Sequence, residues 1–307
     1  MTKREIDVVA VGTCYVDTNV HNFPFNRGSI VGEELIGDRY DVVPGGSAVN
    51  FCRLGSALGL QTAFIGITGD DANGDTLEHL LNQEGVRAAL VRKPELQTNI
   101  SFNMTNSEND HIMLTAGTAN AVLDPTIVMP KLSELLPEAR ILYLGGCLKL
   151  KAFEHAFAEI VQLANESSAE LVIDHGRVPA TVSPEMIAAV KDLVLCSRYY
   201  FPSREEFCAL WQVTSIDEGM SKLQKLAPNL TVVVKDGARG AFYWANNSTH
   251  NVEANKVDTV VNATGAGDSF NAGVITALLS ERVLPEAIAY GCKVAAAKIT
   301  AADIPAL

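Results

Sequence analysis

The chain has 307 residues, 48% of them hydrophobic and 20% charged, which is typical of a soluble globular protein with one large α/β domain or two small ones. Its formal net charge of −12 argues against a general nucleic-acid or membrane-surface binder, because both functions need positive potential. A nucleotide ligand stays open, since it needs only a local anion site. No apolar run approaches a membrane span, and six scattered cysteines without a C-x-x-C pair predict reduced thiols in a cytoplasmic protein.

Short apolar runs alternate along the chain with segments of helical spacing. The first run, Ile6–Val11, is rich in β-branched residues, ends at Gly12 and predicts a buried parallel strand. Further strands are predicted at Thr62–Ile67, Arg140–Leu144, Glu170–Ile173, Leu193–Cys196, Leu230–Lys235 and Ala241–Trp244. Helices are predicted between them, including Ser47–Leu58, Gly74–Gln83, Lys151–Ala164, Ser215–Leu226, Asp268–Leu279 and Pro285–Ile299. The alternation predicts a single α/β domain over residues 1–307, with a mainly parallel sheet covered on both faces.

Two segments break this alternation. Residues 15–43 lack a helical period and are rich in turn formers, and residues 98–114 carry two alternating runs around the turn NSEND, a hairpin pattern. Together they can form a small second sheet, either as a lid over a site or as an edge hairpin without function. Exposed strands of such a lid would pair readily, which makes a homodimer formed through the lid a hypothesis.

The sequence NATGAGDSFNAG, residues 262–273, places Gly265, Ala266 and Gly267 before a carboxylate at the start of an apolar helix. The first N–H groups of a helix have no partner within it and carry partial positive charge, so small residues let them close around an oxyanion. Asp268 would then lie beside an anion site. That combination suits phosphoryl transfer, in which a carboxylate takes the proton of the acceptor hydroxyl. The alternative is that Asp268 only caps the helix.

Two other phosphate-binding motifs do not fit the chain. A G-x-x-x-x-G-K-[ST] motif is absent from the sequence, which excludes a P-loop. The glycine-rich turn lies near the C-terminus and not after the first strand, which disfavours a Rossmann dehydrogenase.

With these motifs the chain resembles the ribokinase-like (PfkB) family of carbohydrate and nucleoside kinases. The C-terminal signature of that family, close to D-T-x-G-A-G-D, is matched from Thr264 onward. The N-terminal signature, a Gly-Gly pair opening a helix with an Asn four residues later, is matched in PGGSAVNFCRLGSALG at Gly45, Gly46 and Asn50. Similar segments in family order are VGTCYVD, FIGITGDDANGD, AGTANAVLDP and VVVKDGARGAFYW, so the resemblance runs from about residue 6 to residue 303.

The resemblance implies a fold, an activity and a set of site residues. The fold is a three-layer α/β/α sandwich with a mostly parallel central sheet and a small β-sheet lid, and the activity is ATP-dependent phosphorylation of a sugar, sugar acid or nucleoside. Asp268 is implied as the catalytic base, with Gly265, Ala266 and Gly267 as the anion hole. The implied acceptor-binding residues are Asp17, Gly45, Gly46 and Asn50. The implied nucleotide-binding residues are Lys235, Gly237, Gly240 and Cys292. The alternative for Lys235 is an exposed lysine at a strand end. The alternative for Cys292 is a packed thiol without a ligand contact, and this alternative is favoured.

Three positions depart from the family pattern. In FPSREEF, Glu206 matches the glutamate that organises Mg²⁺ and its waters, but Ser203 stands where the family has Asn, so Mg²⁺ dependence is expected with altered tuning. Asn262 replaces an Asp that helps bind a monovalent cation, which leaves activation by K⁺ open. Tyr15, two residues before Asp17, replaces a small amide and can stack on a sugar or base or pack within the lid.

Two functions stay open at this point. Ser47 stands where ribokinase has a lysine, which disfavours a true ribokinase among the kinases. The leading hypothesis is a kinase of a sugar, sugar acid or nucleoside. The second is a sugar- or nucleoside-binding regulatory protein that kept the fold and lost catalysis, with Ser203 and Asn262 as early signs of decay. The intact Asp268 and glycine turn favour the kinase.

Overall fold

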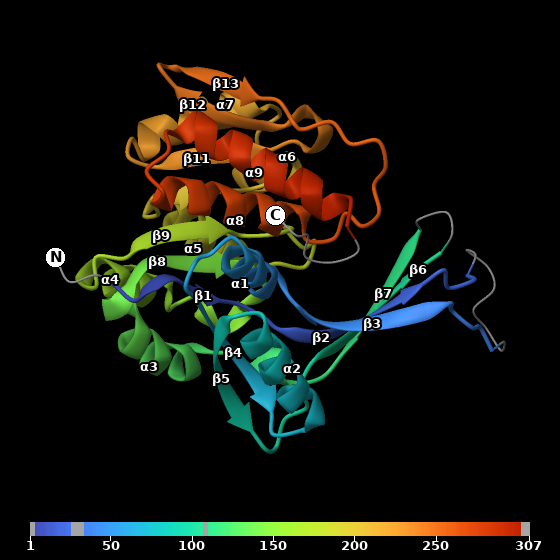
Figure 1. Ribbon diagram of the computed structural model, residues 1–307. Coiled ribbons are helices and arrows are strands. Elements are labelled where there is room, and N and C mark those ends of the chain that lie inside the picture. Colours follow the sequence, from blue (N-terminus) through green and yellow to red (C-terminus); the bar gives the residue numbers. More distant parts are fainter. Residues whose placement is uncertain (1–3, 26–33, 107–109, 302–307) are drawn as a thin grey trace.

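The computed structural model describes residues 4–25, 34–106 and 110–301. Its largest element is a nine-stranded sheet in the order β13-β12-β11-β10-β9-β8-β1-β4-β5 (Figure 1). The strands are β1 (Ile6–Val11), β4 (Thr62–Gly69), β5 (Val86–Lys93), β8 (Ala139–Gly145), β9 (Glu170–Asp174), β10 (Tyr199–Tyr200), β11 (Thr231–Lys235), β12 (Ala241–Ala245) and β13 (Ser248–Val252). Neighbours pair in parallel from β5 to β11, and β12 and β13 add an antiparallel edge.

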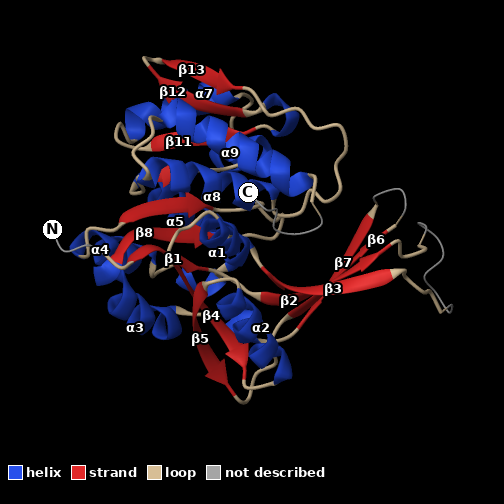
Figure 2. Ribbon diagram, in the orientation of Figure 1, coloured by secondary structure: helices blue, strands red, loops and turns tan. Residues whose placement is uncertain are grey.

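Helices cover both faces of this sheet (Figure 2). They are α1 (Ser47–Ala57), α2 (Ala72–Gln83), α3 (Pro125–Leu135), α4 (Phe157–Glu166), α5 (Pro184–Leu195), α6 (Arg204–Trp211), α7 (Ile216–Leu226), α8 (Ala266–Leu279) and α9 (Leu284–Ile299). In β1, Val9 and Val11 pack into the core under α3 to α7, and Val8 and Ala10 pack into the core under α1, α2, α8 and α9. Burial on both faces explains why the central strands read as continuous apolar runs. The predicted α/β fold is confirmed.

A second sheet of four strands, in the order β3-β2-β6-β7, projects from the body (Figures 1 and 2). It is formed by β2 (Tyr15–His21), β3 (Arg39–Gly45), β6 (Ile100–Thr105) and β7 (His111–Ala116). The two segments that break the α/β alternation therefore pair with each other, as predicted. Residues 26–33 of the first segment and 107–109 of the NSEND turn lie outside the described residues.

One predicted strand is wrong. Leu193–Cys196 was expected to be a buried strand, but Leu193 to Leu195 form the last turn of α5 and Cys196 is its C-cap. A short apolar run fits a buried strand or a buried helix face equally well. The start of α5 decides between them, because Ser183 accepts a hydrogen bond from Met186 N and proline follows at the first helical position. The strand of this region is β10, which has only two residues.

The helix predicted from Lys151 to Ala164 begins only at Phe157, after a short 3₁₀ turn.

Candidate active site

The glycine-rich turn ends where α8 begins. Gly265 is the residue before the helix, and its φ of 76° lies in the left-handed region that glycine adopts without strain. Asp268 therefore lies in the first turn of α8, as predicted. The turn is closely surrounded, because a β-carbon on Gly265 would lie 3.4 Å from Nδ2 of Asn50, and one on Gly267 would lie 3.4 Å from Nζ of Lys235. The start of α8 is thus placed between α1 and the end of β11.

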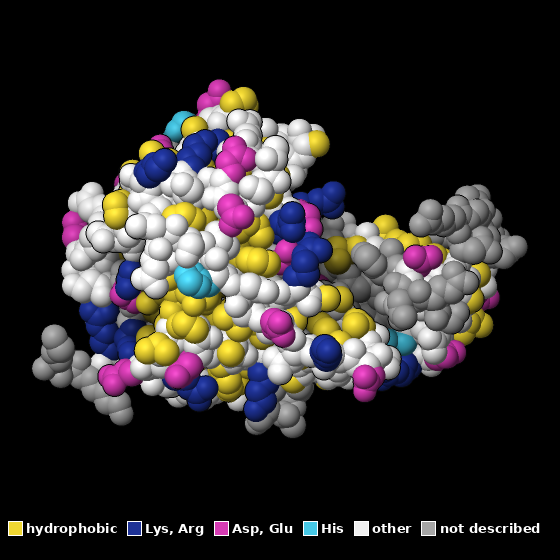
Figure 3. Space-filling model, turned by 90° about the horizontal axis from the view of Figure 1, so that it is seen from above, with side chains coloured by type: hydrophobic (Ala, Val, Ile, Leu, Met, Phe, Trp, Pro, Cys, Tyr) yellow, Lys and Arg dark blue, Asp and Glu magenta, His cyan; other side chains and the backbone are white. Residues whose placement is uncertain are grey.

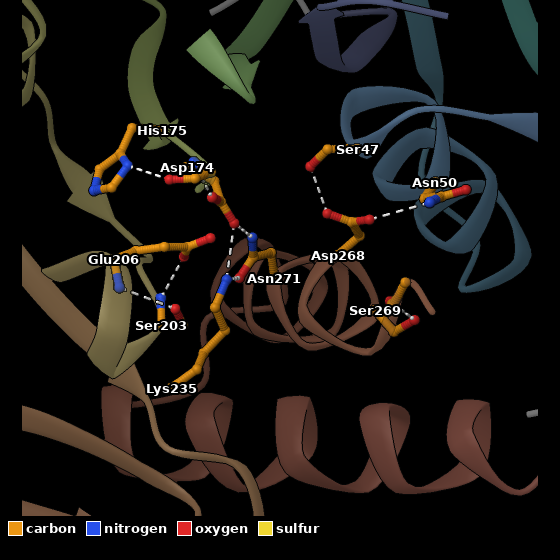
Figure 4. Close-up of polar contacts among 12 residues, drawn as sticks. Ser47, Asn50, Asp174, His175, Ser203, Glu206, Lys235, Asp268, Ser269 and Asn271 are labelled. Atoms are coloured by element: carbon orange, nitrogen blue, oxygen red, sulfur yellow. Dashed lines mark hydrogen bonds and ion pairs between the residues drawn. The ribbon is translucent and has the colours of Figure 1, made fainter. Parts of the chain in front are cut away.

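Two side chains of α1 hold the carboxylate of Asp268. Ser47 Oγ donates to Oδ1 over 2.6 Å, and Asn50 Nδ2 donates to Oδ2 over 3.1 Å (Figure 4). Burial raises the pKa of Asp268 from 3.8 to about 7, with a further rise from the nearby Asp174 carboxylate. The bonds from Ser47 and Asn50 and the charge of Lys235 oppose this rise. Asp268 is therefore a carboxylate that gains and loses its proton near neutral pH.

Close backbone contacts fix the start of α1. The N-cap, Gly46, has a φ of 112°, and a β-carbon there would come within 2.3 Å of the carbonyl oxygen of Thr13. At the preceding position a β-carbon on Gly45 would overlap the carboxyl group of Asp17, at 2.1 Å. Burial raises the pKa of Asp17 to about 6, against the opposing charges of Arg53 and Lys149 and a hydrogen bond from Asn103. Three predicted acceptor residues therefore meet where the lid joins the body.

Tyr15 lies at the same junction. It begins β2, and its pairing partner in β3 is Gly45. The side chain is half-buried. Stacking on a ligand stays a prediction.

Lys235 ends β11 and belongs to a buried ion pair. Its Nζ donates to Asp174 Oδ2 over 2.8 Å and to Asn271 Oδ1 over 3.2 Å. Asn271 Nδ2 donates to the same Asp174 oxygen over 2.7 Å. Burial alone would raise the pKa of Asp174, but the charge and hydrogen bond of Lys235 hold it below the usual value. Only 12% of the Lys235 side chain is exposed, so the alternative of an exposed strand-end lysine is wrong.

Asp174 and Asn271 are absent from the predicted site. Asp174 is the last residue of the apolar strand β9, and a carboxylate at the carboxyl end of a parallel strand is a recognisable signal. Asn271 follows Asp268 by three residues on α8, so both lie on one face of that helix. Its side-chain amide also donates to the hydroxyl of Tyr143 over 3.0 Å.

Glu206, the predicted Mg²⁺ residue, lies in the first turn of α6. The amide of Ser203 donates to Glu206 Oε2 over 2.7 Å, and the amide of Glu206 donates back to Ser203 Oγ over 3.3 Å, forming a capping box. Ser203 thus caps a helix where the family has Asn. Ser203 also forms a parallel bridge with Lys235, and the charge of Glu206 acts on the neighbouring His175, whose pKa it helps to raise against the lowering effect of burial.

The site fits a nucleotide-bound Mg²⁺ better than a metal held by protein alone. Among the residues that the structure describes, no group of three or more His, Cys, Asp or Glu side chains can hold a metal ion. Mg²⁺ in nucleotide sites is held mainly by phosphate oxygens and water, with one or two carboxylates. Glu206 is half-buried and is held by Ser203, which pairs with Lys235, so a single carboxylate of the predicted kind lies in this region.

The other predicted nucleotide-binding residues are Gly237 and Gly240, which follow β11, and Cys292 on α9. Gly237 opens a short turn after β11, and a β-carbon on Gly240 would come within 2.0 Å of the Val252 carbonyl oxygen. A larger residue at position 240 would collide with this backbone, so glycine is required there. Cys292 is buried on α9, and burial raises the pKa of its thiol to about 11. This agrees with the packed-thiol interpretation, and a contact with adenine stays a prediction.

The sequence pattern of the pfkB family carbohydrate kinases matches residues 6–303. The chain belongs to this family. As a pfkB family carbohydrate kinase it is a phosphotransferase with an alcohol acceptor. Within the described part of this pfkB kinase, no helix is both long and apolar enough to cross a membrane.

Curated relatives of this pfkB kinase include two kinds of sugar kinase. It is 28% identical over 301 residues to the 5-dehydro-2-deoxygluconokinase of Halalkalibacterium halodurans, covering 94% of this chain and 87% of the relative. It is 25% identical over 274 residues to the ribokinase of Haemophilus influenzae, covering 88% and 85%.

Solved structures share the fold. A protein from E. coli assigned as ribokinase II, in complex with ATP and Mg²⁺, matches with a TM-score of 0.83 at 20% identity, covering 97% of this chain and 94% of that one. Ribokinase from Arabidopsis thaliana complexed with ribose and ATP matches with a TM-score of 0.78 at 20% identity, covering 98% and 95%.

Proposed function

We propose that this chain transfers the γ-phosphoryl group of ATP to a hydroxyl of a small sugar, sugar acid or nucleoside, with Asp268 as general base. The observation that carries the proposal is the Asp268 carboxylate, held in the first turn of α8 by Ser47 and Asn50 close to the ammonium of Lys235. Burial raises the pKa of Asp268 to about 7. A general base is most effective when its pKa lies near the working pH. The names of the relatives favour a sugar or sugar-acid acceptor.

Each group of the site has a separate task in this proposal. Ser47 and Asn50 each take one lone pair of an Asp268 oxygen, so both oxygens can still accept a bond from the acceptor hydroxyl. Asp268 takes the proton of that hydroxyl as the oxygen attacks the γ-phosphorus in line and the bond to the β-phosphate oxygen breaks. Backbone N–H groups of Gly265, Ala266 and Gly267 stabilise the charge on the transferring group.

The nucleotide and the acceptor approach Asp268 from different sides. Lys235, Gly237 and Gly240 would lie along the phosphates, with Cys292 toward the base. Glu206 would hold waters of a Mg²⁺ ion, which would neutralise phosphate charge when bound. The acceptor is held by Asp17, Gly45, Gly46 and Asn50, with Tyr15 against an apolar face of the ligand. Lid closure would exclude water as a competing acceptor.

The test is an ADP-release assay with ATP and Mg²⁺ over a panel of sugars, sugar acids and nucleosides, with and without K⁺. The kinase proposal expects one acceptor class to release ADP stoichiometrically with phosphorylated product. The regulatory alternative expects ligands that raise the melting temperature and release no ADP. The K⁺ arm decides whether Asn262, whose side chain accepts from the amide of Thr264 over 2.9 Å, still serves a cation site.

The pKa of Asp268 predicts how turnover depends on pH. The carboxylate must be ionised to accept a proton, so kcat/KM, which reports the pKa of the free enzyme, is expected to rise with pH through about 7 and reach a plateau above about 8. A kcat/KM–pH profile between pH 5.5 and 9 measures this. A profile that is flat between pH 6 and 8 would contradict a base with this pKa.

We also propose that the protein forms a homodimer through the lid and works in the cytoplasm, where ATP is abundant and its six unpaired cysteines stay reduced. Strand register places Val42, Phe102 and Leu114 on one face of the lid, and Phe102 and Leu114 are 41% and 57% exposed. Figure 3 shows hydrophobic side chains exposed on the lid. An apolar sheet face of this kind is suited to packing against a second copy.

Light scattering is expected to give the mass of a dimer for the native protein and of a monomer for Phe102→Glu, because a charge would be buried in the interface. Val283→Glu, at an exposed surface position of the body, serves as the control. A native protein of 32.9 kDa in solution would reject the dimer.

A further inference from the structure

Ser47 contacts the reacting centre of the proposed kinase, yet neither the sequence motifs nor the relatives' names assign it a role. Its hydroxyl donates to Asp268 Oδ1 over 2.6 Å, the shorter of the two bonds that the carboxylate receives from α1. Hydroxyl-to-carboxylate bonds of this length are among the stronger hydrogen bonds in proteins. The contact joins α1 to α8 over 221 positions of the chain.

The backbone around Ser47 leaves it little freedom. Ser47 is the first residue of α1, directly after Gly46, which lies against Thr13. The next residue, Ala48, packs against the ends of β1 and β8. A β-carbon on Gly12, after β1, would lie 2.7 Å from Cβ of Ala48, and a β-carbon on Gly145, in β8, would lie 2.9 Å from the Ala48 amide nitrogen. The hydroxyl is therefore presented to Asp268 from a rigid position.

A second residue, Tyr143 on β8, packs against α1 next to Ser47. Phe51 of α1 stacks on Tyr143, with ring centroids 3.9 Å apart and an interplanar angle of 12°. The Tyr143 hydroxyl is buried, accepts from Asn271 and also interacts with Ser47. Because Ser47, Asn50 and Phe51 stand at positions i, i+3 and i+4, one face of α1 carries all three contacts.

We propose that Ser47 is a positioning residue that orients the carboxylate of Asp268 and sets its basicity, and that Tyr143 holds Ser47 in place. The inference rests on the proposed function, in which Asp268 is the base. Other charged or titratable groups near Asp268 are Asp174 on β9, Lys235 on β11 and Tyr143 itself. Ser47 differs from them because it touches the carboxylate directly and carries no charge.

Removing the hydroxyl of Ser47 takes a hydrogen bond from the ionised form of Asp268. Ser47→Ala is therefore expected to raise the pKa of Asp268 by about 1, since a donor to the charged form lowers a carboxyl pKa. Ser47→Thr keeps the hydroxyl and is expected to keep the pKa. Tyr143→Phe is expected to give a smaller rise, because Ser47 remains but is less well held.

The experiment is a pH titration of the ligand-free full chain, labelled with [4-¹³C]aspartate and followed by NMR. Asp268→Asn identifies the signal of Asp268. Ser56→Ala is the matched control, since Ser56 lies on the same helix and donates to the Glu84 carbonyl, away from Asp268. Thermal denaturation of every variant shows that it is folded.

The expected result is a raised pKa in Ser47→Ala and native values in Ser47→Thr and Ser56→Ala. An unchanged pKa in Ser47→Ala, or an equal rise in Ser47→Thr, would overturn the proposal. The titration needs no acceptor and no turnover. It therefore decides the role of Ser47 even if the ADP-release panel rejects the kinase proposal. If the panel shows kinase activity but the pKa of Asp268 in Ser47→Ala is unchanged, only the role of Ser47 is rejected.

Discussion

Replacing Asp268 with Asn is expected to lower kcat by about 10²–10⁴-fold, because the amide has the shape of the carboxylate but cannot accept the proton of the acceptor hydroxyl. Binding of ATP should be nearly unchanged, since the backbone of α8 and the side chain of Lys235 stay in place. Turnover is measured by ADP release and ATP affinity by calorimetry. Full activity of the variant would show that the base has been assigned to the wrong residue.

The stability of the same variant provides an independent control. The folded-state pKa of Asp268 is raised above its ordinary value of 3.8, so the stability that this group contributes is fully present below about pH 4 and is lost as pH rises through about 7. An Asn at this position does not titrate. Urea unfolding is therefore expected to show that Asp268→Asn gains stability relative to the native protein between pH 5 and pH 8. A stability difference that does not change with pH would mean that the carboxylate is ionised without cost in the folded state, and the opposite trend would mean that folding lowers its pKa.

Replacing Lys235 with Met is expected to lower the free energy of unfolding by about 3–5 kcal/mol, because it leaves the buried carboxylate of Asp174 without its cation. The variant should also bind ATP more weakly, if Lys235 lies along the phosphates. Urea denaturation and ATP calorimetry measure the two effects separately.

Two further variants separate stability from nucleotide binding. The double variant Lys235→Met with Asp174→Asn removes both charges, so it is expected to recover much of the lost stability without recovering ATP affinity. Lys131→Met removes a partly exposed surface lysine that pairs with Glu134 over 3.2 Å and is expected to change stability by less than about 1 kcal/mol. A Lys235→Met variant as stable as the native protein would show that Asp174 does not depend on this ion pair.

Several features of the site were readable from short stretches of sequence. The Gly265–Gly267 turn before Asp268 predicts a helix start with an anion site, because glycine conformation and helix polarity are local properties. The serine and glutamate three residues apart in FPSREEF form a capping box, a local pattern that explains Ser203 better than decay of a metal site does. The run Leu193–Cys196 shows the limit of such evidence, since four apolar residues fit either a strand or a helix turn.

By itself the sequence determined the α/β alternation, the two lid segments and the family, because hydrophobic periodicity and signature motifs are written along the chain. Only the tertiary structure decided how Asp268 is held. Burial raises its pKa most, its partners Ser47 and Asn50 come from α1, and the charges that shift its pKa further come from β9 and β11. These groups lie far apart in sequence, and their burial and mutual distances, which fix their protonation, exist only once the sheet and its helices have packed.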